Sequence, residues 1–163
     1  MPWTTPQTWT PGQVVAASDL NSNIRDNSLY LFAGRPLGYV QRTGSADYAI
    51  SSTTFADVDA ANLILTLTIS SGRVLCIASG GLLNPVSSAL ALDFIADSTT
   101  RAGGVSGVLL SQFSNTGQVY TAVGVFSGLS AGSHTFKLQS RVLSGTGYLY
   151  NNASPITLLA LEI

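Results

Sequence analysis

The chain has 163 residues and a net charge of −1, and charged side chains make up 9% of it, against roughly 25% in an average soluble domain. Its single lysine and six arginines are scattered, which argues against nucleic-acid binding because neutralising phosphates needs clustered cations. No apolar run is long enough to span a membrane, and the single cysteine excludes an internal disulfide and a cysteine metal cluster.

The first 13 residues, MPWTTPQTWTPGQ, are rich in Trp, Thr and Pro. Their three prolines remove backbone donors and oppose a helix, so we expect an extended arm. Trp3 and Trp9 are strong anchors when buried, and together with Pro11 they predict a peptide that docks on a partner protein or on a neighbouring subunit. The alternative is that this leader folds back on its own domain.

The stretch that follows is the one segment with a helical pattern. Ser18 is the expected N-cap, Asp19 lies in the first turn, and Gly34 ends the helix. Four positions have the 4-3-4 spacing of a heptad seam: Leu20, Ile24, Asn27 and Leu31. A helix this short is marginal alone in water. Its apolar stripe therefore packs either on its own strand domain or against copies from other chains, in which case Asn27 meets its equivalents near an axis.

From Leu37 the apolar pattern changes to a period of two, and Gly, Ser, Asn and Pro separate short segments. We predict strands at 38–43, 54–58, 62–70, 73–79, 89–96, 104–112, 118–126, 134–142, 147–150 and 156–162, with a break at Gly80–Gly81. The fold class is therefore mainly β: an antiparallel β-sandwich or jelly roll preceded by an extended N-terminal arm and one short α-helix. Residues 1–36 form the arm and helix, and residues 37–163 form the head.

Three of these segments, 61–70, 89–96 and 135–142, show how the two faces of a strand differ in polarity. Each has one strongly apolar face and a second face that is neutral or weakly apolar instead of highly charged. A second face of that kind suits a subunit interface. We therefore expect the neutral sheet faces to be buried between copies of the head.

The sequence contains no constellation of catalytic residues, so we predict neither an enzyme nor a cofactor or metal. His134 is the only histidine, which favours a structural or surface role. Asp57 and Asp59 share one strand face and could hold a cation or form a hydrolase pair, although the end of a strand or a turn is the more ordinary place for both.

One cluster suggests carbohydrate binding. Tyr148 and Tyr150 alternate along a strand and are followed by Asn151. A tyrosine ring stacks on a sugar while an amide forms hydrogen bonds with it, so these three residues are candidates for glycan contact. The alternative is that the tyrosines form a rim of the core.

Both ends of the chain resemble parts of known protein families. The stretch TWTPGQVVAASDLNSNIRDNSLYLFAG, residues 8–34, resembles an N-terminal module of tailed-bacteriophage structural proteins, which has a Trp-containing lead-in, a Gly and then a V-x-A-x-D-L-N-x-x-I-R-D-N helix. The matching positions are Trp9, Gly12, Val15, Ala17, Asp19, Leu20, Asn21, Ile24, Arg25, Asp26 and Asn27. The stretches LSAGSHTFKLQSRV and LLALEI are similar to the closing strands of trimeric jelly-roll heads of the tumour-necrosis-factor and complement C1q type, which occur in phage fibres and capsid decorations.

The resemblance implies a non-enzymatic virion protein that is assembled in the host cytoplasm. It implies a homotrimeric head and an N-terminal segment bound to other virion proteins of the capsid or tail. The chain lacks the long shaft of a full-length tail fibre, which favours a capsid decoration, a head fibre or a short tail fibre. A carbohydrate-binding module that recognises a host surface glycan is the alternative function.

Overall fold

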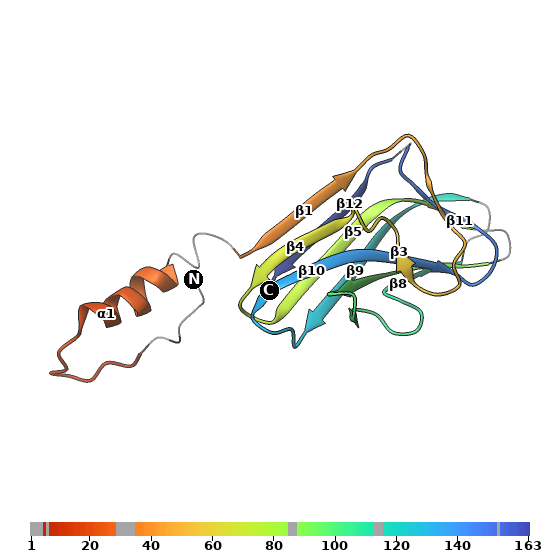
Figure 1. Cartoon of the computed structure of the whole chain (residues 1–163). Helices are drawn as coiled ribbons and strands as arrows, with labels where there is room; N and C mark the ends of the chain where they lie inside the picture. The colour runs from red at the N-terminus through yellow and green to blue at the C-terminus, as the bar shows by residue number, and fades with distance from the viewer. Residues whose placement is uncertain (1–4, 6, 29–34, 85–87, 113–115, 153) are drawn as a thin grey trace. The chain divides into compact units, whose positions relative to one another are not determined.

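The computed structural model describes the chain except for residues 1–4, 6, 29–34, 85–87, 113–115 and 153 (Figure 1). Its internal contacts divide the chain into two compact units, Met1–Pro36 and Leu37–Ile163. No helix in the described part of the chain is long and apolar enough to cross a membrane.

The N-terminal unit contains a reverse turn followed by a helix. The N–H of Gln13 donates to the carbonyl of Thr10 at 3.1 Å, and between them Pro11 precedes Gly12, whose φ is +83°. This is the arrangement of a type II turn, which needs a positive φ at its third residue. The backbone N–H of Gln7 donates to Asn23 Oδ1 at 2.7 Å, so the leader is held against its own helix in this unit.

The helix begins earlier than predicted. Segment α1 spans Ala17–Leu20 and continues as a π-helical segment, η1, over Asn21–Asp26. Ala16 occupies the N-cap position without a side-chain hydrogen bond, so the prediction of Ser18 as N-cap is wrong. The two alanines at 16 and 17 are good helix formers and extend the helix backwards. Asp19 lies in the first turn, as expected.

The π-helical segment affects the predicted seam. A π-helix closes its hydrogen bonds one residue further back than an α-helix, so each turn holds more residues. A 4-3-4 spacing then no longer keeps its members on one line. Leu20 and Ile24 are 45% and 57% exposed, whereas Asn27 is buried at 3%. Leu31 lies outside the described residues.

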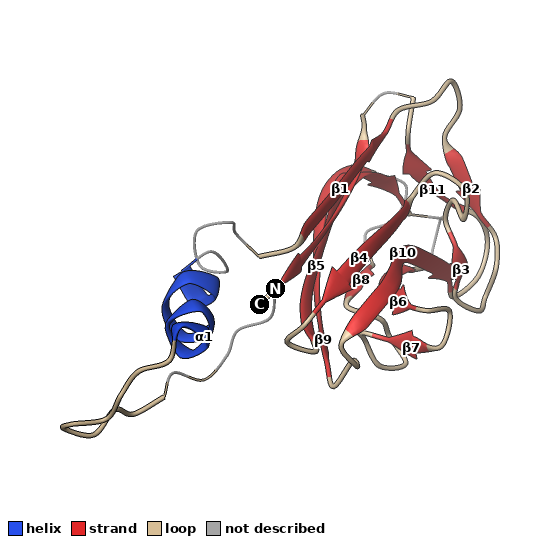
Figure 2. Ribbon diagram, turned by 60° about the vertical axis from the view of Figure 1, so that its left-hand side comes forward, coloured by secondary structure: helices blue, strands red, loops and turns tan. Residues whose placement is uncertain are grey.

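The second unit is an antiparallel β-sandwich, as predicted (Figure 2). Sheet A is built from six strands: β1 (Leu37–Arg42), β2 (Tyr48–Ile50), β5 (Arg73–Leu83), β9 (Gly117–Ser127), β11 (Gly147–Tyr150) and β12 (Ile156–Glu162). Strand β9 pairs with β5 along its whole length, so β12 and β11 share the other edge of β5. Strand β1 adds to β12, and β2 adds to β11.

Sheet B also contains six strands: β3 (Ala56–Asp57), β4 (Ile64–Ile69), β6 (Leu90–Ala96), β7 (Thr100–Arg101), β8 (Leu109–Ser111) and β10 (Gly132–Val142). Strands β4 and β3 pair with one edge of β10, and β6 pairs with the other. The short strands β7 and β8 complete the far edge of β6.

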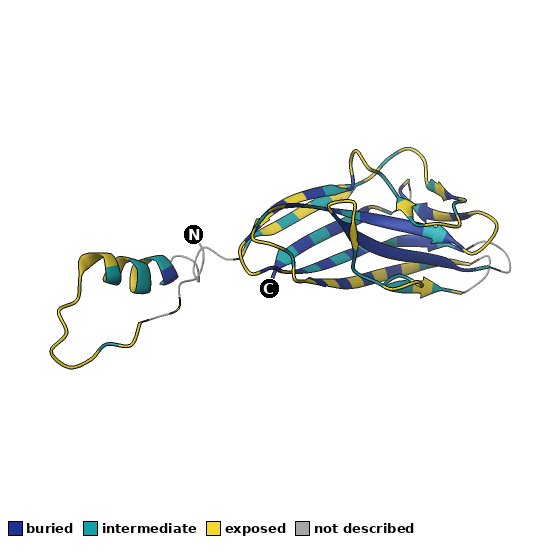
Figure 3. Ribbon diagram, turned by 60° about the horizontal axis from the view of Figure 1, so that its bottom comes forward, coloured by how far each residue is buried: buried dark blue, intermediate teal, exposed yellow. Residues whose placement is uncertain are grey.

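The core lies between the two sheets, where alternate residues of each strand point inward. Figure 3 shows the resulting stripes of buried and exposed residues along the strands. The rings of Phe126 and Phe136, one from each sheet, pack at a centroid distance of 5.5 Å. The largest fully buried apolar side chains are Phe94, Phe136, Leu63, Leu82, Leu90, Leu92, Leu138, Leu149, Ile156, Leu158 and Val74.

Two strand predictions are wrong in detail, and two strands were not predicted. Strand β5 runs through the predicted break at Gly80–Gly81, because both glycines are covered by tyrosine rings from neighbouring strands. The predicted strand 104–112 shortens to β8, because Gly107 has a φ of +75° and belongs to a turn. The two strands that were not predicted, β2 and β7, have three and two residues, and each is too short to show a period of two.

Candidate functional site

The outer face of sheet A, which points away from sheet B, carries two adjacent rows of apolar side chains. The strand register places Leu37, Leu161, Leu75 and Val125 in one row across β1, β12, β5 and β9. The next row contains Tyr39, Leu159, Ile77 and Val123. We call these eight residues the apolar face.

The apolar face is open to solvent in the described chain. Leu37 and Tyr39 are each 57% exposed, Val123 and Val125 about as much, and the four residues of the two central strands are half-buried. None of the eight is charged. The first charge on β5 is Arg73, in the row beyond Leu75.

A row of hydroxyl and amide groups borders the apolar face. It consists of Gln41, Thr157, Ser79 and Thr121. The hydroxyls of Ser79 and Thr157 are 2.5 Å apart and satisfy each other. Beyond this row Val119 is 91% exposed, so the surface stays neutral along most of β9.

The tyrosines proposed for glycan contact lie at the far end of the same outer face. A Cβ atom at Gly81 would lie 2.6 Å from Tyr150 Cδ2, and one at Gly117 would lie 2.9 Å from the Tyr150 hydroxyl. The ring of Tyr150 therefore fills the space above two glycines and has a structural role, as an aromatic residue often does beside a strand glycine. Tyr148 is 38% exposed, and its contact with a glycan stays a prediction.

Asn151 is not available to a sugar. It is buried, and its side-chain amide donates to the backbone carbonyl of Ala46 at 3.1 Å. Its backbone carbonyl accepts from Gly44 N–H at 3.1 Å. Its backbone N–H donates to Asp47 at 2.8 Å. These bonds hold the loop after β1, so the expectation that Asn151 contacts glycan is corrected: burial commits the side chain to the fold.

The outer face of sheet B differs because charged side chains lie on it and loops cover them. Asp93 is fully buried on β6, and Arg101 forms an ion pair with it at 2.6 Å. Backbone N–H groups of Phe94 and Gly103 donate to the same carboxylate at 2.8 Å. The Arg101 guanidinium also stacks on Phe55, at 3.8 Å from the ring centroid. A buried charge is tolerated when it is paired and hydrogen-bonded in this way.

A second arginine forms hydrogen bonds with the loops that cover this face. Arg141 on β10 donates to the carbonyls of Val105 at 2.8 Å and Thr53 at 3.4 Å, and its guanidinium lies 5.1 Å from the Phe55 ring centroid. The three segments that predicted a neutral interface, 61–70, 89–96 and 135–142, all supply strands of sheet B. The expectation is therefore corrected for 89–96 and 135–142, because loops and ion pairs of the same chain occupy much of their outer face. On 61–70, Thr66 and Thr68 are exposed, and burial of that segment between copies stays a prediction.

Asp57 and Asp59 have separate partners. Asp57 accepts from Lys137 Nζ and from the amide of Gln139, both at 2.8 Å. These bonds leave Asp57 with structural partners on β10. They give no support to a shared cation or to a hydrolase pair with Asp59.

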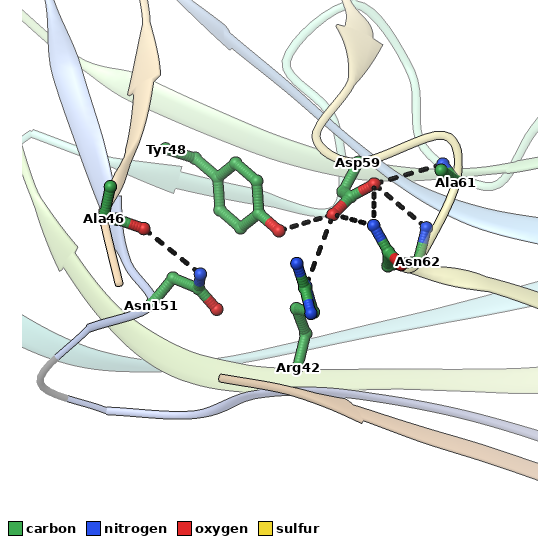
Figure 4. A network of polar contacts seen from close by, with 7 residues as sticks. All are labelled: Arg42, Ala46, Tyr48, Asp59, Ala61, Asn62 and Asn151. Atoms are coloured by element: carbon green, nitrogen blue, oxygen red, sulfur yellow. Dashed lines mark hydrogen bonds and ion pairs between the residues drawn. The ribbon is translucent and has the colours of Figure 1, made fainter. Parts of the chain in front are cut away.

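Asp59 is the centre of a polar network that joins β1, β2 and the loop before β4 (Figure 4). Tyr48 donates its hydroxyl at 2.5 Å, Asn62 donates through its side chain and backbone, and Arg42 Nε lies 3.6 Å away. Burial alone would raise the pKa of Asp59, but the hydrogen bonds from Tyr48, Asn62 and Ala61 outweigh it and lower the pKa to about 2. The carboxylate is therefore a structural cross-link.

His134 also has a structural environment. Its Nδ1 lies 2.6 Å from Asp97 Oδ2, and its Nε2 lies 2.9 Å from the carbonyl of Ser130. The hydrogen bond with Asp97, followed by that with Ser130, raises the pKa of His134. Among the described residues no group of three or more His, Cys, Asp or Glu side chains is placed to hold a metal ion.

The predicted attachment residues lie in the N-terminal unit. Trp9 is half-buried and Pro11 is exposed in the turn, while Trp3 lies outside the described residues. Their binding to a partner stays a prediction, as does the trimer seam of Leu20, Ile24, Asn27 and Leu31.

Sequence reasoning missed the apolar face because its eight residues come from four strands that are far apart in the chain. A signal was present in β9, whose sequence GQVYTAVGVFS contains no charge on either face. The Asp93–Arg101–Phe55 cluster was not predicted, because Arg101 lies on β7, which is too short to show a period of two, and Phe55 lies on a loop.

No known protein family matches the chain, and no curated protein matches it in sequence.

Proposed function

We propose that the chain is a non-enzymatic structural protein of a bacteriophage particle. In this proposal it assembles as a homotrimer through the outer face of sheet A, and its N-terminal unit binds other virion proteins of the capsid or tail. The observation that carries the assembly is the apolar face, which has eight uncharged side chains on four adjacent strands and no cover within the described head.

The energetic argument follows from apolar burial. Removing a Leu, Ile or Val side chain from water contributes roughly 1.5–3 kcal/mol when burial is complete. Several such residues per subunit offset the cost of association. Because the face has no charge, identical copies can meet there without like-charge repulsion and without burying an unpaired ion. Contiguous exposed apolar patches on soluble proteins commonly mark interfaces.

The threefold symmetry and the place in a particle rest on the resemblance at the two ends of the chain. The N-terminal unit adds a physical reason for attachment. Leu20 and Ile24 are exposed apolar residues on its helix, and Trp9 and Pro11 lie on the leader that precedes it. A partner that covers these four residues would stabilise both the helix and the leader.

Quantifying the chain in purified particles tests the attachment. The full chain and a chain lacking residues 1–13 are compared by immunoblotting of particles. We expect the deletion to remove the protein from particles while the free protein keeps the oligomeric mass of the full chain. If the full chain is absent from particles, or if the deletion leaves its amount unchanged, the attachment proposal is wrong.

A carbohydrate-binding module remains the second proposal, supported by the exposed ring of Tyr148 at the end of the outer face. The full chain and Tyr148→Ala are compared on a glycan array. Binding that Tyr148→Ala abolishes supports this function, and an array without any bound glycan contradicts it.

A further inference from the structure

Strand β9 lies at the margin of sheet A and has one unpaired edge (Figure 1). Its eleven residues all pair with β5. In the part of the chain that the structure describes, no backbone hydrogen bond joins β9 to an element other than β5. Among the described residues, the opposite edge of β9 is therefore a row of backbone donors and acceptors without a backbone partner.

The hydrogen-bond pattern shows which residues supply that edge. The N–H of Ile163 donates to the carbonyl of Arg73, so Arg73 directs its backbone groups toward β12. The backbone N–H and C=O groups of successive residues point to opposite edges of an antiparallel strand. The backbone groups of Val74 and of every second residue after it therefore point toward β9. Their partners on β9 are its even-numbered residues. The backbone groups of Val119, Thr121, Val123 and Val125 consequently point away from β5.

This edge lacks the features that normally prevent strand addition. Natural sheets protect their margins with short strands, lysine, proline or inward-pointing charges. Strand β9 is eleven residues long and contains no proline and no charged residue. The other margin of sheet A consists of β2, which has three residues, and β1, which has six residues, follows Pro36 and includes Arg42. The contrast indicates that the edge of β9 is covered when the protein is assembled.

We propose that β9 pairs antiparallel with β9 of a second copy of this chain, so that two A sheets join into one. Full overlap of the two strands places the twofold axis at Ala122. Thr121 then lies opposite Val123 of the second copy, and Val119 lies opposite Val125. These pairs are neutral and β-branched, which favours cross-strand packing. No like charges face each other, as they would in a self-paired strand that carries Lys or Arg.

The pairing is independent of the packing of apolar faces. It uses backbone groups at the margin of the sheet. Because the pairing has twofold symmetry, it doubles the number of subunits in the assembly that the apolar face forms. A trimer joined in this way becomes a hexamer, and a chain that does not trimerise becomes a dimer. The two interfaces can therefore fail separately.

Thr121→Pro removes one outward N–H while the ladder with β5 keeps its bonds, because proline is tolerated on an edge strand whose N–H faces solvent. Thr121 lies outside the eight residues of the apolar face. Thr121→Val is the matched control, since it keeps the backbone donor and the branched shape. Sedimentation equilibrium on the full chain gives the mass. We expect Thr121→Pro to halve the mass, with at least a tenfold higher dissociation constant for the pairing, and Thr121→Val to leave the mass unchanged.

A second variant keeps the test independent of how well the proline variant folds. In the double variant Thr121→Cys, Val123→Cys, each new cysteine lies opposite the other across the twofold axis, at a separation that a disulfide can bridge. Cys76 is buried and does not compete. We expect oxidation to give a disulfide-linked dimer on a denaturing gel. Monomers after oxidation, or equal masses for Thr121→Pro and the unmodified chain, overturn the proposal. Leu159→Lys separates it from the face packing, because that variant keeps the β9 pair.

Discussion

The outer faces of the two sheets have opposite chemistry although both belong to one sandwich. On sheet B, Asp93 is buried under Arg101 and Phe55, and Lys137 pairs with Asp57, so side chains of the same chain satisfy the charges. On sheet A, Leu159 and Ile77 lie in a neutral row that no loop of the described head covers.

The chemistry of each face determines where its contacts are made. A face that buries charge must complete its hydrogen bonds within the chain, because an unpaired buried ion costs several kcal/mol. A face made of apolar residues needs no such geometry and remains available to another subunit. The buried charge of sheet B therefore has its partners within one chain, whereas we propose that another subunit covers the outer face of sheet A.

The largest expected effect comes from placing a charge on the apolar face. Leu159→Lys puts an ammonium at the centre of the proposed interface, where its desolvation opposes association. We expect that this variant no longer forms trimers through the apolar face at micromolar concentration. Thr68→Lys, an exposed neutral position on a strand of sheet B, is the matched control and should keep the mass of the unmodified chain. Equal masses for the two variants would place the interface elsewhere.

The largest effect on folding is expected on sheet B. Asp93→Ala leaves Arg101 without its carboxylate and leaves the backbone N–H groups of Phe94 and Gly103 without an acceptor. We expect the free energy of unfolding to fall by about 3–5 kcal/mol. Asp57→Ala, whose carboxylate is partly exposed, should cost about 1 kcal/mol. Urea denaturation of both variants measures the difference, and similar losses would contradict the role of burial.

Acid titration of the Asp59 network should show a smaller effect. The pKa of Asp59 is lowered to about 2, so its ionised form stabilises the fold above about pH 4 and this stabilisation is lost as the pH falls through about 2. We expect Asp59→Asn to be less stable by about 2 kcal/mol at neutral pH. The stabilities of variant and unmodified chain should converge near the acid end, and a constant difference across that range would argue against the network.

The smallest effect concerns His134. Its pKa is raised in the folded state, so its stabilisation is complete below the ordinary histidine value and is lost as the pH rises through the raised pKa. Because Asp97 is partly exposed, we expect less than about 1 kcal/mol. Thermal melts of His134→Gln should lack the decline that the unmodified chain shows on the alkaline side. Parallel declines would assign it to another group.

The fold class could be predicted because it depends on local signals. A period of two in segments such as 134–142 and 156–162, with Gly and Asn between segments, is enough to give strands and an antiparallel sandwich. Two local signals were misleading. Gly80 and Gly81 resemble a break, yet the rings of Tyr120 and Tyr150 need the space that these glycines leave. The heptad spacing assumed an α-helix, and η1 is π-helical.

The apolar face could not be predicted, because it depends on sheet order. Leu37, Leu75, Val125 and Leu161 become neighbours only through the register of four strands. The contact between Asp93 and Arg101 has a different origin, because it follows from the hairpin of β6 and β7, in which Ile95 pairs with Arg101. Long-range pairing decides the apolar face, and a single sequence contains no signal for it. The buried position of Asn151 is also a consequence of loop packing.

The mass of the unmodified full chain in solution is the most direct test of assembly through the apolar face. Sedimentation equilibrium at micromolar concentration should give a whole multiple of the 16.9 kDa chain, three or six, because the apolar face is covered by other copies. A mass of 16.9 kDa at that concentration would contradict the account. The outer face of sheet A would then be a stable solvent-exposed surface.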